Sequence, residues 1–114
     1  VIDVAVAGGA VSLPGVMTPS ESLAALDAGA SGLKMFPASV LGSAGIAAIK
    51  AVLPADTQIC AVGGVSHNDF ADYMAAGIQG FGLGSSLYRP GDTLQMVQAK
   101  AAAAIAAYDS ACQC

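Results

Sequence analysis

Three segments of the sequence repeat one pattern, in which a helix ends at glycine and an apolar strand follows after a short turn. They are Ala7-Gly8-Gly9-Ala10-Val11, Ala28-Gly29-Ala30-Ser31-Gly32-Leu33 and Ala76-Gly77-Ile78-Gln79-Gly80-Phe81. Helices and strands that alternate along a chain are typical of βα units with a parallel sheet. Crossovers between parallel strands are right-handed, and such strands are buried on both faces. The pattern therefore predicts an α/β fold.

Local signals place the elements of this fold. Strands are expected at residues 10–13, 32–36, 58–62 and 80–84. Thr18-Pro19-Ser20-Glu21 predicts a capping box with proline in the first helical turn, and Gly29 suits the end of that helix. The chain begins in a helix, and further helices are expected near residues 44–53, from Ser66 (capped with Asp69) to Gly77, and from Asp92 or Thr93 to Tyr108.

Four βα units correspond to half of a (β/α) barrel of the TIM type, which needs ~250 residues when complete. The alternative is a small open α/β sheet. In a chain that is 55% hydrophobic, an open sheet would expose its inner layer and two unpaired edges. We therefore expect residues 1–114 to form a single partial domain, with strands five to eight of the barrel and their helices. The other half would come from a longer natural chain, of which this sequence is a fragment, or from a partner.

Composition excludes several functions. A net charge of −4 with four cationic residues argues against nucleic acid, which requires clustered basic side chains. No apolar run reaches the ~18 residues needed to span a bilayer, and no basic signal-peptide region is present, so a soluble, cytoplasmic protein without membrane contact is expected. The three cysteines, Cys60, Cys112 and Cys114, form no disulfide framework, and with His67 distant in sequence they predict no metal site.

A lysine stands inside an otherwise apolar strand, in Gly32-Leu33-Lys34-Met35-Phe36-Pro37. Strand alternation places Lys34 and Phe36 on one face, and Leu33 and Met35 on the other. Lysine is rarely buried, and desolvation disfavours its charged form, which turns the amine into a nucleophile near neutral pH. The alternative is a lysine at a strand end whose stem reaches water.

Glycine and serine follow the last two expected strands. Gly63-Gly64 comes after one and Gly84-Ser85-Ser86 after the next. In barrels the loops after strands seven and eight bind phosphate through exposed backbone N–H groups. The sequence therefore predicts an anion site near Lys34. Two roles remain open for Arg89: neutralising a bound phosphate or a position on the surface.

Several runs resemble motifs of the 2-dehydro-3-deoxy-6-phosphogalactonate and 6-phosphogluconate aldolase family. They are Leu33-Lys34-Met35-Phe36-Pro37-Ala38-Ser39, Ala61-Val62-Gly63-Gly64-Val65 and Gly82-Leu83-Gly84-Ser85-Ser86-Leu87-Tyr88, with Pro14-Gly15-Val16-Met17-Thr18-Pro19 similar to the segment after the family's fifth strand. All 114 residues follow the family's second half in order. Val62 and the Gly-Ser-Ser-Leu-Tyr-Arg run resemble the galactonate enzyme more than the gluconate enzyme.

The resemblance implies a class I aldolase that cleaves a phosphorylated keto-acid to pyruvate and glyceraldehyde 3-phosphate. It implies Lys34 as the Schiff-base residue, Phe36 and Pro14 as substrate-binding residues, and Gly63, Gly64 and Ser85 as phosphate-binding residues. No cofactor or metal is implied, and the full-length protein would be a homotrimer.

The family's acid/base glutamate has no counterpart in this sequence, because Glu21, the only glutamate, is explained by its capping box. Two alternatives therefore stay open. One is another phosphate-binding Schiff-base barrel enzyme, and the other is a non-catalytic half-barrel that binds phosphate. Reduction with borohydride in the presence of pyruvate would separate them.

Overall fold

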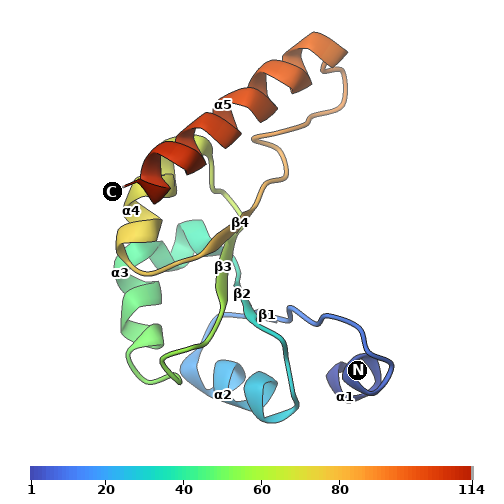
Figure 1. Ribbon diagram of the computed structural model, residues 1–114, viewed down its shortest axis with the longest axis vertical. Coiled ribbons are helices and arrows are strands. Elements are labelled where there is room, and N and C mark those ends of the chain that lie inside the picture. Colours follow the sequence, from blue (N-terminus) through green and yellow to red (C-terminus); the bar gives the residue numbers. More distant parts are fainter. Residues whose placement is uncertain (114) are drawn as a thin grey trace.

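The computed structural model describes residues 1–113 and contains one four-stranded parallel sheet in the order β1-β2-β3-β4 (Figure 1). The strands are β1 Gly15–Val16, β2 Leu33–Met35, β3 Ile59–Val62 and β4 Gly80–Gly82. The helices are α1 Ile2–Ala7, α2 Pro19–Asp27, α3 Ala38–Lys50, α4 Phe70–Ala75 (preceded by the 3-10 turn η1 His67–Asp69) and α5 Leu94–Cys112. A helix follows every strand, so the predicted α/β fold with four βα units is confirmed. Cys114 lies outside the described residues.

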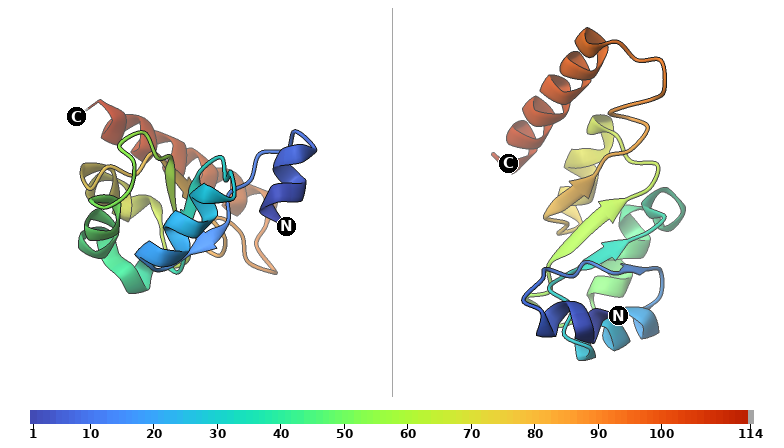
Figure 2. Two further views of the ribbon diagram at one scale, coloured as in Figure 1. Left: turned by 90° about the horizontal axis from the view of Figure 1, so that it is seen from below. Right: turned by 90° about the vertical axis from the view of Figure 1, so that its right-hand side faces the viewer.

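The two faces of the sheet differ in what covers them. Leu33, Met35, Ile59 and Ala61 are fully buried, whereas the residues between them in β2 and β3 are only half-buried. Helices α3 and α4 cover the buried side and lie to the left of the strands in Figure 1. The strands lie in front of these helices in the right-hand view of Figure 2. We call the uncovered side of the sheet the open face. The expected alternation along the strand of Lys34 is therefore confirmed.

Aromatic rings hold the last two βα units together. The rings of Phe70 in α4 and Phe81 in β4 stack with centroids 4.1 Å apart. Tyr108 in α5 meets both rings edge-on, at 6.4 and 6.3 Å. Because Phe81 points to the helices, its neighbours Gly80 and Gly82 face the open side.

Most start and stop signals read from the sequence are confirmed. Thr18 and Glu21 form the capping box of α2, and Ser66 and Asp69 form that of η1. Gly29 and Gly77 follow α2 and α4 with φ of +91° and +85°, a conformation that glycine adopts at little cost. Thr93, rather than Asp92, caps α5, whose Met96 amide donates to the Thr93 hydroxyl.

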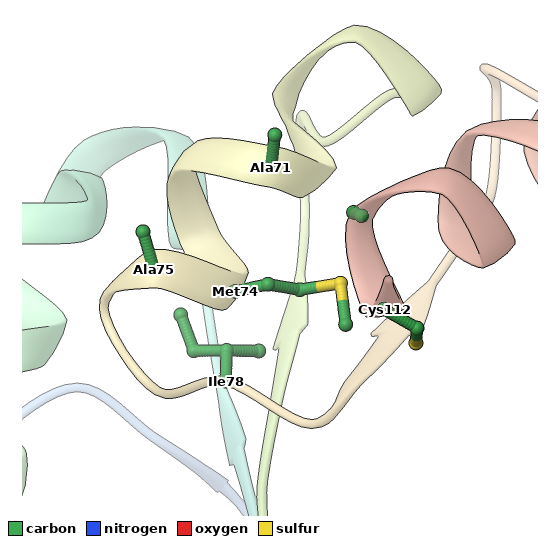
Figure 3. Close-up of a pocket in the computed structure, with 6 residues that line it drawn as sticks. Ala71, Met74, Ala75, Ile78 and Cys112 are labelled. Carbon is green, nitrogen blue, oxygen red and sulfur yellow. The ribbon is translucent and has the colours of Figure 1, made fainter. Parts of the chain in front are cut away.

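Three predicted boundaries are wrong. Residues 10–13 form no strand, because the ladder begins only after Pro14, and Val11 and Leu13 are exposed. α3 begins at Ala38, directly after Pro37, and ends at Lys50, whereas the sequence predicts a helix near residues 44–53. Gly42, with φ +66° and ψ 167°, kinks α3, and only the part after this kink overlaps the predicted helix. α5 continues past Tyr108 to Cys112, since its alanine-rich sequence contains no glycine or proline to stop it. Its end lies beside α4, where Cys112 and Met74 line one hollow (Figure 3).

Lys50 and Lys100 both bond to other segments of the chain. Lys50 is half-buried and its amine donates to the carbonyl of Gly77 at 2.6 Å. Lys100 forms an ion pair with Asp92 at 2.6 Å. Both lysines therefore fix the ends of neighbouring segments. Within residues 1–113, no helix combines the length and the apolar character needed to cross a bilayer.

Candidate functional site

The carboxyl ends of β2, β3 and β4 enclose a cavity of about 220 Å³. It is lined by residues from the three loops that follow these strands: Phe36, Val62, Gly63, Gly64, Val65, Gly82, Gly84, Ser85 and Ser86. Four residues predicted from the sequence, Phe36, Gly63, Gly64 and Ser85, thus line one cavity. None of the lining side chains carries a charge, so an anion bound here would meet backbone amides and hydroxyls.

Gly63 and Gly64 shape this cavity through their backbone. Their φ angles are +94° and +70°, which side-chain-bearing residues rarely adopt. A Cβ on Gly63 would lie 2.9 Å from the Phe36 ring, and one on Gly64 would collide with the Ser39 side chain. Glycine is therefore required at both positions for conformation and for space. The Phe36–Pro37 peptide bond, beside Gly63, is cis.

A single helical turn follows β4 and closes the cavity. The amides of Leu87 and Tyr88 donate to the carbonyl of Gly84, and the Ser86 hydroxyl donates to the carbonyl of Val65 at 2.9 Å. Ser86 thus ties the two loops together, a role that no pattern in the sequence indicates. In the described part of the chain, no acceptor is bonded to the amides of Gly64, Ser85 and Ser86 or to the Ser85 hydroxyl. These donors are free to bind an anion.

Lys34 lies on the open face, next to the cavity. Its amine nitrogen is 5.4 Å from the centroid of the Phe36 ring. Gly15 is its register partner on β1, and a Cβ there would lie 3.1 Å from the lysine Cε. Glycine at this position therefore leaves room for the lysine stem. The Lys34 amine and the backbone of Gly63 therefore both lie beside the ring of Phe36.

Cys60 is the register partner of Lys34 on β3, and Gly80 is the partner of Cys60 on β4. Cys60 is half-buried on the open face. Burial raises the pKa of its thiol, which keeps it neutral near pH 7. The neighbour of Lys34 across the sheet is therefore an uncharged thiol.

Pro14 and Glu21 lie away from the cavity beside Phe36. The carbonyl of Pro14 accepts from the Lys34 amide at 2.9 Å, and Pro14 lines a separate hollow of about 330 Å³ between β1 and α2. The Glu21 carboxylate accepts from the amides of Met17 and Thr18 at 2.8 and 3.0 Å, and these bonds, led by that of Met17, lower its pKa. Glu21 is a capping residue, as its sequence context predicts.

His67 and Arg89 lie in the segments that follow β3 and β4. His67 begins η1 and is exposed. Arg89 is exposed, and its Nε donates to the carbonyl of Ser85 at 3.1 Å. Residues 1–113 contain no cluster of three or more histidine, cysteine or acidic side chains with the arrangement of a metal site.

Comparison with known proteins places this geometry in a family. Residues 1–107 match the family model "KDPG and KHG aldolase". The chain is 62% identical over 110 residues to the "Probable 2-dehydro-3-deoxy-6-phosphogalactonate aldolase" of Rhizobium meliloti (strain 1021), covering 96% of this chain and 52% of the relative. It is 46% identical over 113 residues to the "2-dehydro-3-deoxy-6-phosphogalactonate aldolase" of Escherichia coli (strain K12), covering 99% of this chain and 55% of the relative.

A solved structure supports the fold independently. The structure described as "Native KDPGal structure" superposes with a TM-score of 0.96 and 45% sequence identity, over 99% of this chain and 55% of that one. The chain therefore spans about half the length of the curated relatives it matches. The parallel sheet with one open face is a half of a TIM-type barrel.

Proposed function

The chain belongs to the KDPG and KHG aldolase family, and we propose that it carries the Schiff-base and phosphate-binding half of a class I aldolase. The proposed substrate is 2-dehydro-3-deoxy-6-phosphogalactonate, and the products are pyruvate and glyceraldehyde 3-phosphate. The observation that carries this proposal is the amine of Lys34, 5.4 Å from the ring of Phe36, a residue that also lines the anion cavity.

The chemistry follows from an amine and an anion site on the same side of a sheet. The neutral amine of Lys34 attacks the C2 carbonyl of the substrate, water leaves, and a protonated imine forms. The C3–C4 bond then breaks as a base takes the proton of the C4 hydroxyl, and the electron pair of that bond enters the imine. Protonation of the resulting enamine and hydrolysis release pyruvate. In residues 1–113 the cavity lining offers no titratable side chain for the base.

The free amides support phosphate binding at the far end of the substrate. Gly64, Ser85 and Ser86 present N–H groups without bonded acceptors in the described chain, and the Ser85 hydroxyl is exposed beside them. Backbone donors held in place bind phosphate without the cost of ordering long side chains. We propose Gly63, Gly64 and Ser85 as the phosphate-binding residues, with Phe36 beside the keto-acid end. Pro14, whose carbonyl accepts from the Lys34 amide, would support that end through its backbone.

The choice of the galactonate substrate has two supports. Val62 places an apolar side chain in the cavity lining, where a threonine would offer a hydroxyl to the sugar chain. Two relatives that match nearly the whole chain carry the name of the phosphogalactonate enzyme. Turnover of the two epimeric substrates by the full natural polypeptide, measured side by side, tests this choice; a preference for the gluconate epimer would contradict it.

Imine trapping tests the central claim. The full natural polypeptide is incubated with pyruvate and borohydride, and the reduced adduct is located by peptide mass mapping. We expect the adduct on Lys34, its loss in Lys34→Ala, and its retention in Lys50→Ala and Lys100→Ala. An adduct that persists in Lys34→Ala would refute the assignment.

A second candidate function is a non-catalytic half-barrel that binds phosphate, favoured by the absence of a base among the cavity residues of the described chain. This candidate predicts phosphate binding with no pyruvate adduct at all. The proposed homotrimer and cytoplasmic location remain predictions, and the solution mass of the full polypeptide tests the former.

A further inference from the structure

We propose that Arg89 is a positioning residue for the phosphate site, and that it acts through the Ser85–Ser86 peptide rather than by touching the phosphate. This inference rests on the proposed function of the cavity. It assigns a role to an arginine that does not line the cavity and that the catalytic scheme leaves unused.

The carbonyl and the amide of one peptide unit respond together. Arg89 Nε donates to the Ser85 carbonyl oxygen at 3.1 Å, and the N–H of the same peptide unit belongs to Ser86. A cationic donor at the oxygen withdraws electron density across the peptide and makes that N–H a stronger donor. Since Ser86 lines the cavity and its amide has no acceptor among the described residues, the strengthened donor is available to an anion there.

The cavity needs such a contribution because its lining is uncharged. A phosphate ester carries about two negative charges above neutral pH, and neutral donors alone compensate them weakly. Arg89 adds positive charge behind the turn and leaves the cavity itself open to the ligand. The geometry thus separates the source of the charge from the atoms that contact the phosphate.

A second set of contacts fixes the backbone of Arg89. Its amide donates to the Asp92 carboxylate at 2.8 Å, and the Asp92 amide donates to the Arg89 carbonyl at 3.0 Å. Asp92 in turn accepts from Lys100 of α5 at 2.6 Å, and this bond is the largest cause of the lowered pKa of Asp92. The arginine is therefore held by the start of α5, which keeps its side chain directed at the turn.

The test compares two ligands of similar shape and different charge on the full natural polypeptide. Methyl phosphate is a dianion at pH 8, and methyl sulfate is a monoanion. Calorimetric affinities are measured for wild type, Arg89→Gln and Arg89→Lys. Lys50→Gln is the matched control, because it also removes one cation. Lys50 bonds Gly77, which precedes β4 and so lies at the amino ends of the strands, away from the cavity.

We expect Arg89→Gln to lose about three- to fivefold in methyl phosphate affinity, the scale of an exposed charge interaction, and to lose less for methyl sulfate. Arg89→Lys should lose less methyl phosphate affinity than Arg89→Gln, because a lysine keeps a charged donor near the Ser85 carbonyl. Lys50→Gln should bind as wild type does, and all variants should still form the pyruvate adduct on Lys34.

Three outcomes would overturn the inference. Unchanged methyl phosphate affinity in Arg89→Gln would show that the arginine contributes nothing. Equal losses for both ligands in Arg89→Gln and Arg89→Lys would show that the side chain only holds the turn in shape. Failure of wild type to bind methyl phosphate would overturn the proposed phosphate site together with this inference, whereas the first two outcomes leave that site intact.

Discussion

Replacing Gly63 with alanine should disturb the site in two ways that can be separated. The first is backbone conformation, because φ is +94° and a left-handed conformation costs a residue with a Cβ about 1–2 kcal/mol. The second is steric: the new methyl group would lie 2.9 Å from two carbons of the Phe36 ring and 3.2 Å from the Cα of Pro37.

Gly91 provides the matched control for the first effect. Its φ is +95°, and a Cβ built on it has no neighbour within 4 Å. Gly91→Ala should therefore cost only the conformational part, about 1–2 kcal/mol. Gly63→Ala should lower the free energy of unfolding by about 1–2 kcal/mol more than Gly91→Ala does, which is at the low end for overpacking. The reason is that Phe36 is 48% exposed, so its ring can turn outward, whereas the Pro37 backbone cannot.

Denaturant unfolding of the full natural polypeptide measures both costs, and methyl phosphate affinity reports on the cavity. We expect the double variant Phe36→Ala/Gly63→Ala to recover the steric part, with a coupling energy of about 1 kcal/mol. Equal destabilisation by Gly63→Ala and Gly91→Ala, with zero coupling to Phe36 and unchanged ligand affinity, would refute the claim that Gly63 and Phe36 shape one site.

Two further predictions concern single side chains. Ser85→Ala should weaken methyl phosphate binding by about 1–2 kcal/mol through loss of a hydrogen bond to a charged group, and an unchanged calorimetric affinity would remove its hydroxyl from the site. Glu21 has a lowered pKa in the folded chain, so its stabilising bonds are present above the ordinary glutamate pKa of about 4.3 and are lost as the pH falls through the folded value. Glu21→Gln should therefore be less stable than wild type at pH 7 and converge with it in acid; a stability gap that persists at low pH would contradict this sign.

The sequence was sufficient to predict those parts of the fold that depend on local chemistry. The capping boxes at Thr18 and Ser66 and the glycine stops at Gly29 and Gly77 follow from residue types at fixed spacing, and the structure contains all four. The loops containing Gly63-Gly64 and Ser85 could be placed together because the carboxyl ends of parallel strands meet at one edge.

The contacts that could not be predicted join residues distant in sequence. Val11 and Leu13 have the apolar side chains typical of a strand, but pairing with β2 begins only after Pro14. Strand propensity does not determine the register with a partner strand. The bond between the Ser86 hydroxyl and the Val65 carbonyl depends on two loops meeting in space. The pairing of Lys100 with Asp92 likewise depends on how the segment before α5 folds back.

Because burial alternates along β2 and β3, neighbouring residues of these strands contribute to different properties of the protein. Leu33, Met35, Ile59 and Ala61 are wholly enclosed, so changes there alter how much folded protein a cell contains. Lys34, which lies between two of them, is only half-buried, so changes there alter what each folded molecule can do. Along these strands, substitutions that lower the amount of folded protein should therefore alternate with substitutions that lower its activity, with a period of two residues.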